Sequence, residues 1–262
     1  MEILISNDDG VYADGIKSLK DTLSEIANVT VVAPLEERST TGHTLTLDQP
    51  LRLVELEKNV YGCSGYPADC AVLGIIHLFK EKMNKRPDLV VSGINRGPNL
   101  GQDTYYSGTV AAAREAVFHG VPAISVSTAS DFGTPKKDKL FYDTASYFVK
   151  KFIDDKLHTF LKPMGLLNIN VPNLPLEKIK GVELTRLGFQ KYSEEIQKRE
   201  DFRGRPYFWI GGIYEGFEGN DDTDCYAVSR GKVSVTPIDL LEKGRLDQNK
   251  WAELSEKLLE LN

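Results

Sequence analysis

"EILISNDDGVYADGIKSLKDTLSEIANVTVVAP" (residues 2–34) places two apolar runs on either side of an amphipathic segment. The apolar residues in 2–6 predict a buried strand, and a second strand is predicted at 29–33. The segment between them predicts a helix over 14–27. Its apolar residues recur on one helical face: Ile16, Leu19, Leu23 and Ile26. A strand, a helix and a strand in succession favour a parallel pair.

The same alternation continues through the first two thirds of the chain. Further strands are predicted within 51–64, at 88–92 and at 123–127, and further helices at 67–79, 109–119 and 138–155. Such alternation predicts an α/β fold, in which helices cover both faces of a mostly parallel sheet.

The pattern changes after about residue 180. "RPYFWIGGIYEGF" (205–217) and "DCYAVSRGKVSVTP" (224–237) combine aromatic residues with turn residues, which predicts hairpins and an arm. The end, 250–262, predicts an amphipathic helix with an apolar line: Trp251, Leu254, Leu258 and Leu261. That helix docks either on its own core or on a partner subunit. We therefore expect a core over 1–180, and a hairpin and helix region over 181–262 that serves oligomerisation.

Composition excludes several classes of protein. The chain has 262 residues, 41% of them hydrophobic, and no apolar run of the length a membrane span needs. Its net charge of −6 argues against binding a long nucleic acid. The sequence does not indicate a signal peptide. A paired cysteine framework is not indicated either, because the three cysteines have no CxxC spacing. We expect a cytoplasmic protein.

Three polar loops follow predicted strands: "NDDG" (7–10), "ERSTTGHT" (37–44) and "SGINRGPNLGQDTYYSGTV" (92–110). In an open parallel sheet, ligands bind at the carboxyl ends of the strands. The common position of these loops predicts one composite site.

Asp8 and Asp9 stand side by side directly after the first strand. A hairpin turn does not explain them, because a helix follows, and helix capping would use only one carboxylate. Two carboxylates held together need a cation, unless one takes a proton. Oxygen ligands of this kind predict a divalent ion, Mg²⁺ or Mn²⁺.

In the third loop, Gly93, Gly97 and Gly101 alternate with Asn95 and Asn99. Glycines allow close backbone approach, and asparagines supply neutral donors and oxygen ligands. The spacing matches neither a dinucleotide fingerprint nor a P-loop. Ser107, Gly108 and Thr109 lead into a helix, where free amides and hydroxyls favour a bound phosphate. Either hydroxyl could instead cap the helix, and the two roles are compatible.

Two other polar segments carry weaker signals. Ser39 could ligate a metal, although its loop taken alone resembles a solvated turn. The acidic stretch at 220–224 repeats the "NDD" pattern, but no core strand precedes it. We expect it to be an exposed loop.

Several blocks together resemble the stationary-phase survival protein SurE family of metal-dependent nucleotidases. The blocks are "ILISNDDG", "VVAPLEERSTTGHTLT", "GYPADC", "DLVVSGINRGPNLGQDTYYSGTVAAAREA", "PAISVS", "LNINVP" and "GKVSVTP". They extend over most of the chain in the family's order. The chain differs at 114–116, where we expect the family to have an acid–Gly pair more often.

The resemblance implies a Rossmann-like three-layer sandwich and a homodimer or homotetramer with exchanged C-terminal elements. It implies one divalent metal ion held by Asp8, Asp9, Ser39 and Asn95. The implied substrates are nucleoside 5′- and 3′-monophosphates, with polyphosphate in some members.

The resulting hypothesis is metal-assisted hydrolysis of a phosphomonoester. Asp8, Asp9, Asn95 and Ser107 are the predicted catalytic residues, while Asn99, Ser107, Gly108 and Thr109 are predicted to bind phosphate or substrate. Attack by Ser107 or Asp8 is a covalent alternative. Rival functions are a nucleotide-binding protein without turnover and a phospho-acceptor regulatory protein.

Overall fold

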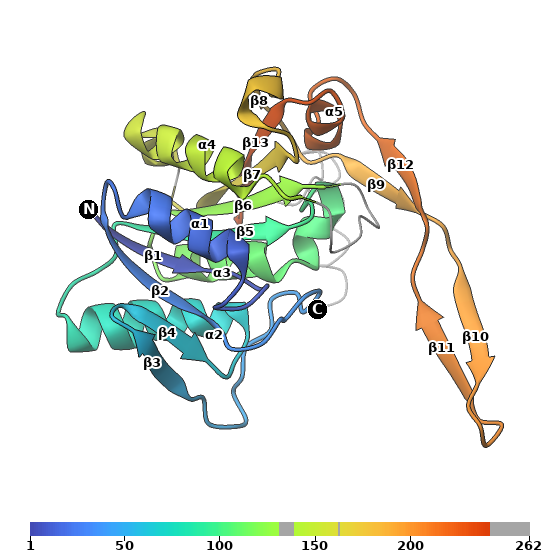
Figure 1. The fold of residues 1–262 in the computed structure, drawn as a ribbon, viewed down its shortest axis with the longest axis horizontal. Helices are drawn as coiled ribbons and strands as arrows, with labels where there is room; N and C mark the ends of the chain where they lie inside the picture. Colours follow the sequence, from blue (N-terminus) through green and yellow to red (C-terminus); the bar gives the residue numbers. More distant parts are fainter. Residues whose placement is uncertain (131–138, 162, 242–262) are drawn as a thin grey trace, which may run out of the picture.

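The computed structural model describes residues 1–130, 139–161 and 163–241 (Figure 1). Its strands are β1 (Glu2–Ser6), β2 (Asn28–Pro34), β3 (Leu53–Glu57), β4 (Val60–Cys63), β5 (Leu89–Arg96), β6 (Ala123–Ala129), β7 (Gly165–Pro172), β8 (Val182–Leu184), β9 (Phe189–Tyr192), β10 (Ile196–Glu200), β11 (Pro206–Ile210), β12 (Tyr214–Glu218) and β13 (Val233–Asp239). The α-helices are α1 (Asp14–Leu23), α2 (Pro67–Val72), α3 (Gly108–Phe118), α4 (Tyr142–Asp154) and α5 (Asp224–Ser229). A π-helix, η1 (Leu73–Lys82), extends α2, and three short 3₁₀ turns are η2 (Gly101–Tyr105), η3 (Leu157–Phe160) and η4 (Leu176–Lys178).

Nine strands form the main sheet within the described residues, in the order β3-β4-β2-β1-β5-β6-β7-β13-β8. All neighbours from β4 to β7 are parallel, whereas β3 and β13 each run antiparallel to a neighbour. The sheet is therefore mostly parallel, as the alternation of strands and helices predicts.

Alternate residues of β1 enter two separate apolar layers. Ile3 and Ile5 belong to the cluster that includes the buried faces of α1 and α4. Leu4 points to the opposite cluster, which includes α2, η1 and α3. Successive strand residues face opposite sides of a sheet, so a strand buried on both faces is apolar throughout. The three-layer α/β sandwich is confirmed (Figure 1).

The segment after residue 180 contributes both to the sheet and to an arm. Strand β13 lies between β7 and β8 in the main sheet. Strands β9 and β12 form a separate two-stranded ribbon, and β10 and β11 extend it as a hairpin that projects away from the body (Figure 1). The predicted arm is confirmed for 205–217, which supplies β11 and β12. The hairpin predicted for 224–237 is wrong, because this stretch forms α5 and the sheet strand β13, which pairs with β7 and β8. The helix predicted at 250–262, with Trp251, Leu254, Leu258 and Leu261, lies outside the described residues.

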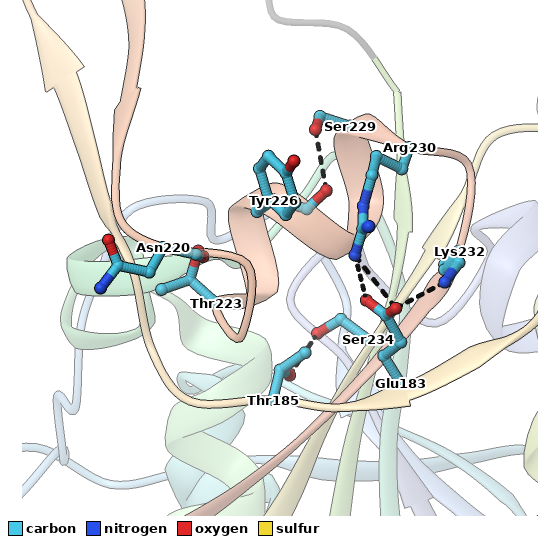
Figure 2. Close-up of polar contacts among 9 residues, drawn as sticks. All are labelled: Glu183, Thr185, Asn220, Thr223, Tyr226, Ser229, Arg230, Lys232 and Ser234. Carbon is cyan, nitrogen blue, oxygen red and sulfur yellow. Dashed lines mark hydrogen bonds and ion pairs between the residues drawn. The ribbon is translucent and has the colours of Figure 1, made fainter.

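Helix α5 is held between the ribbon and the sheet. Arg230, just after α5, donates to both carboxylate oxygens of Glu183 at 2.8 and 3.0 Å. Lys232 donates to the same carboxylate at 2.5 Å, and Thr185 bonds to Ser234 (Figure 2). These bonds join the end of α5 to β8 and β13.

One boundary that positions a predicted site residue differs from the prediction. Strand β5 continues to Arg96, so Asn95 lies near the end of a strand rather than in the loop that follows. Its pairing with β6 is irregular between Ser92 and Asn95.

No helix in the described parts of the chain has both the length and the hydropathy needed to cross a bilayer.

Candidate active site

The acidic pair lies at the carboxyl end of β1, in the middle of the sheet. Asn7 closes the turn after the strand, since its side chain donates to the Gly10 carbonyl at 2.9 Å and accepts from the Gly10 amide at 3.2 Å. Gly10 has a φ of 102°, a conformation that glycine adopts readily. This turn holds Asp8 and Asp9 where the strand ends.

Asp8 is buried against the N-terminus of α3. Only 4% of the residue is exposed, and its Oδ1 accepts a hydrogen bond from the Thr109 hydroxyl. Burial raises the pKa of Asp8 to about 7, and the charge of Asp9 adds to the rise. Hydrogen bonds from Thr109 act in the opposite direction without cancelling it. Asp8 is therefore a carboxylate that a cation would stabilise.

Asp9 faces a cavity beside the pair. Its Oδ2 accepts from the backbone N–H of Arg96 at 2.9 Å, which ties the end of β1 to the end of β5. The cavity has a volume of 570 Å³, and Asp9, Tyr12, Arg96 and Tyr142 are among its lining residues. Burial and then the Asp9 charge raise the pKa of the Tyr142 hydroxyl, which therefore stays protonated at neutral pH.

The start of α3 packs against Asp8. Ser107 caps the helix, because its Oγ accepts from the Val110 N–H at 3.1 Å. A Cβ atom at Gly108 would lie 2.8 Å from the Cβ of Asp8, so only glycine allows this approach. Thr109 is fully buried, and its hydroxyl is used on Asp8. The first turn of α3 thus contacts Asp8 directly.

Asn95 and Asn99 are placed differently from one another. The side-chain amide of Asn95 is half-buried and donates to the Gly97 carbonyl at 2.9 Å. Asn99 is 6% exposed, and its side-chain amide donates to Ser127 on β6 at 2.8 Å. Asn99 is therefore anchored to the core at the edge of the site.

Ser39 lies on the loop that borders Asp8. The Arg38 N–H donates to the Asp8 carbonyl at 2.7 Å, which brings the backbone of this loop to the acidic pair. Ser39 itself is exposed, and its hydroxyl donates to Glu37 at 3.0 Å. Its loop belongs to the site, but its side chain points to another acidic residue in this structure.

The donor set suits a hard divalent cation. Groups of three or more His, Cys, Asp or Glu side chains able to hold a metal do not occur among the described residues. Mg²⁺ commonly binds through one or two carboxylates and keeps water in other positions. Two adjacent carboxylates, one of them buried with a raised pKa, fit that pattern.

Sequence reasoning missed the groups that hold these loops in place. His43 Nε2 lies 2.7 Å from a carboxylate oxygen of Glu115 on α3, and His119 lies 3.1 Å from the other oxygen. The first contact joins the 37–44 loop to α3. Asp224, expected in an exposed loop, is instead fully buried and accepts the Gly101 N–H. Residues so far apart in the chain give no local signal of their pairing.

Comparisons with known proteins identify the family to which this chain belongs. Residues 3–194 match the family described as Survival protein SurE. A 5′-nucleotidase SurE from Nitrosococcus oceani is 46% identical over 250 residues, which cover 95% of this chain and 96% of that protein. A 5′-nucleotidase SurE from Geobacter metallireducens is 47% identical over 240 residues, 92% of each chain. The crystal structure of the SurE protein from Aquifex aeolicus superposes with a TM-score of 0.81 at 36% identity, and covers 99% of this chain and 100% of that one.

Proposed function

Because this chain belongs to the survival protein SurE family, we propose that it is a metal-dependent 5′-nucleotidase. It hydrolyses nucleoside 5′-monophosphates to nucleoside and phosphate. The observation that carries the proposal is the position of Asp8 and Asp9 at the end of β1, with Asp8 against the first turn of α3. That arrangement sets a cation site beside a helix N-terminus, where phosphate binds favourably.

Asp8, Asp9, Asn95 and Ser39 hold one divalent ion, Mg²⁺ or Mn²⁺. When bound, such an ion supplies Lewis-acid stabilisation of phosphate oxygens and lowers the pKa of a bound water. The residues assigned to it offer carboxylate, amide and hydroxyl oxygens, which suit hard cations.

The chain's own groups orient the substrate. The first turn of α3 presents the backbone N–H of Gly108 and the Ser107 hydroxyl to the phosphate, where negative charge develops during hydrolysis. Thr109 keeps Asp8 in place through its hydroxyl. Asn99 borders the phosphate or ribose. A carboxylate oxygen that does not bind the metal takes the proton of the attacking water.

Other features of the function follow the family resemblance. We propose activity on 3′-monophosphates and on polyphosphate, and a homodimer or homotetramer built through residues 181–262 beside the 1–180 core. Exposed apolar residues on the arm, including Phe208, Trp209 and Ile210, support its use in assembly. Three free, buried cysteines support a cytoplasmic location.

The test is phosphate release from a panel of nucleoside 5′- and 3′-monophosphates. Protein stripped with a chelator is assayed alone and with Mn²⁺ or Mg²⁺, next to Asp8→Asn and the matched surface variant Asp154→Asn. We expect release only with metal, its loss in Asp8→Asn, and normal release in Asp154→Asn. Nucleotide binding without release under any metal would instead favour a binding protein, and a phosphorylated residue trapped in a quenched reaction would favour the covalent alternative.

A further inference from the structure

The loop between β5 and α3 is supported at two separate points. The first support comes from the core. The Asn99 N–H donates to the side chain of Asn170 at 2.8 Å, and the Asn99 carbonyl accepts from the amides of Asn168 and Asn170 at 2.8 and 3.0 Å. Both partners lie on β7, so this end of the loop moves with the sheet.

The second support comes from the segment after residue 180. Asp224 is fully buried at the start of α5, and its two oxygens accept three backbone N–H groups. Oδ2 accepts from Gly101 at 2.9 Å, while Oδ1 accepts from Gly188 and Cys225, each at 2.8 Å. One carboxylate therefore joins the loop between β5 and α3 (the site loop), the residue just before β9, and α5. Because the end of α5 is bonded to the sheet (Figure 2), Asp224 has a fixed position.

Asp103 makes a second link two residues further along. Its side chain accepts from the Gln190 amide and the Tyr192 hydroxyl of β9, both at 2.5 Å. Its backbone carbonyl accepts the N–H of Ser107 at 3.1 Å. A single residue thus connects β9, at the base of the arm, with the residue that caps α3 and starts the phosphate cradle (Ser107–Thr109).

We propose that Asp103 and Asp224 are positioning residues for the phosphate cradle, and that through them the base of the arm sets its geometry. The proposal rests on the proposed function for the role of the cradle. Neither carboxylate contacts the acidic pair in the described structure; each acts through the backbone of the loop. Displacement of a bound group by about 1 Å can cost about a hundredfold in rate, so small shifts of Ser107 matter.

The site loop is the point at which the arm and the catalytic core meet. Strand β9 leads directly into β10 of the arm, whose residues are all exposed. A contact made on the arm can therefore shift Ser107 through β9 and one residue, Asp103. This linkage makes the activity sensitive to whatever contacts the arm.

The experiment compares Asp224→Asn, Asp103→Asn and Tyr192→Phe with wild type. The probe is the Kd of inorganic phosphate in the presence of Mn²⁺, together with kcat and KM for a nucleoside 5′-monophosphate. All are measured well below the melting temperature of each variant. We expect the phosphate Kd to rise and kcat/KM to fall, each about tenfold, because one or two loop hydrogen bonds are lost.

Matched controls separate positioning from general destabilisation. Asp201→Asn removes a carboxylate that accepts two backbone N–H groups in the arm hairpin, and Tyr147→Phe removes an exposed hydroxyl on α4. Both should leave the phosphate Kd unchanged. In the double variant Asp103→Asn/Tyr192→Phe, the effects should not fully add, because both changes act on the same contact between Asp103 and Tyr192.

Two outcomes would overturn the inference. In one, the Asp103 and Asp224 variants lose thermal stability while their phosphate Kd and kcat/KM stay at wild-type values. In the other, the effects of Asp103→Asn and Tyr192→Phe add fully. A wild-type protein that binds phosphate but releases none from any nucleotide would count against the proposed function instead, and the phosphate Kd would still test the positioning role.

Discussion

Asp8→Asn should make the metal-free protein more stable at alkaline pH while abolishing its activity. Asp8 is 4% exposed, and burial together with the Asp9 charge raises its pKa from 3.8 to about 7. Each pKa unit corresponds to about 1.4 kcal/mol, so the ionised carboxylate costs the folded state about 4 kcal/mol. Asparagine keeps an acceptor oxygen for Thr109 and carries no charge.

The sign of the pH dependence follows from the raised pKa. The folded state binds the Asp8 proton more tightly than the unfolded state does, so stability falls as pH rises from about 4 to about 7. The stabilisation by Asp8→Asn should therefore be absent near pH 4 and complete above pH 7. For a chain of this size, about 4 kcal/mol corresponds to a rise in melting temperature of roughly 8–16 °C.

The assay is thermal unfolding in chelator at pH 4, 6 and 8, repeated with Mn²⁺. Wild type should gain stability from the metal by mass action, whereas Asp8→Asn should gain little. Asp154→Asn, an exposed carboxylate on α4, should follow wild type throughout. If Asp8→Asn were no more stable than wild type at pH 8 without metal, the buried-charge reasoning would be refuted.

Three further predictions address other parts of the site and core. Gly108→Ala should lower kcat/KM about a hundredfold, because the new Cβ would lie 2.8 Å from the Cβ of Asp8. Steady-state kinetics measure this loss, and Gly211→Ala, where a Cβ would enter open space, is the control. Glu115→Gln should destabilise the protein by about 1–3 kcal/mol at neutral pH. The His43 hydrogen bond holds the pKa of Glu115 below 4.5. The loss of stability in Glu115→Gln should therefore persist above pH 4.5 and disappear as pH falls below that value. Urea unfolding across pH measures this loss, with the exposed Glu81→Gln as control. Phe79→Ala should cost about 3–5 kcal/mol in the same unfolding assay, because the side chain is fully buried, yet leave the phosphate Kd of folded protein unchanged.

The sequence predicts the layers well because strand burial and helix periodicity are local properties. Ile3, Leu4 and Ile5 must be buried on both faces of a sheet, and the structure places them in two opposite clusters. The position of the acidic pair follows from the same reasoning, since it depends only on where a parallel strand ends.

What local patterns do not predict is how distant segments hold the loops. The stretch at 220–224 has the composition of a surface loop, and Asp222 is indeed exposed and paired with Arg186. Asp224 is buried because backbone N–H groups of Gly101 and Gly188 converge on it, from residues 123 and 36 positions away. No periodicity or spacing encodes such a contact. In the same way, β13 pairs with β7 in the sheet although the arm lies between these two strands in the sequence.

These long-range contacts explain why the site can be rigid although it consists of loops. Asn99 is fixed by β7, Gly101 by Asp224, and the 37–44 loop by the contact between His43 and Glu115. Each support uses a buried polar group whose bonds are satisfied within the protein, and such networks favour one arrangement over others. The supports come from three different regions of the chain. The acidic pair and the first turn of α3 therefore keep their relative positions only when all three regions are folded. Residues beyond 180 therefore take part in building the site even though none of them is a predicted ligand.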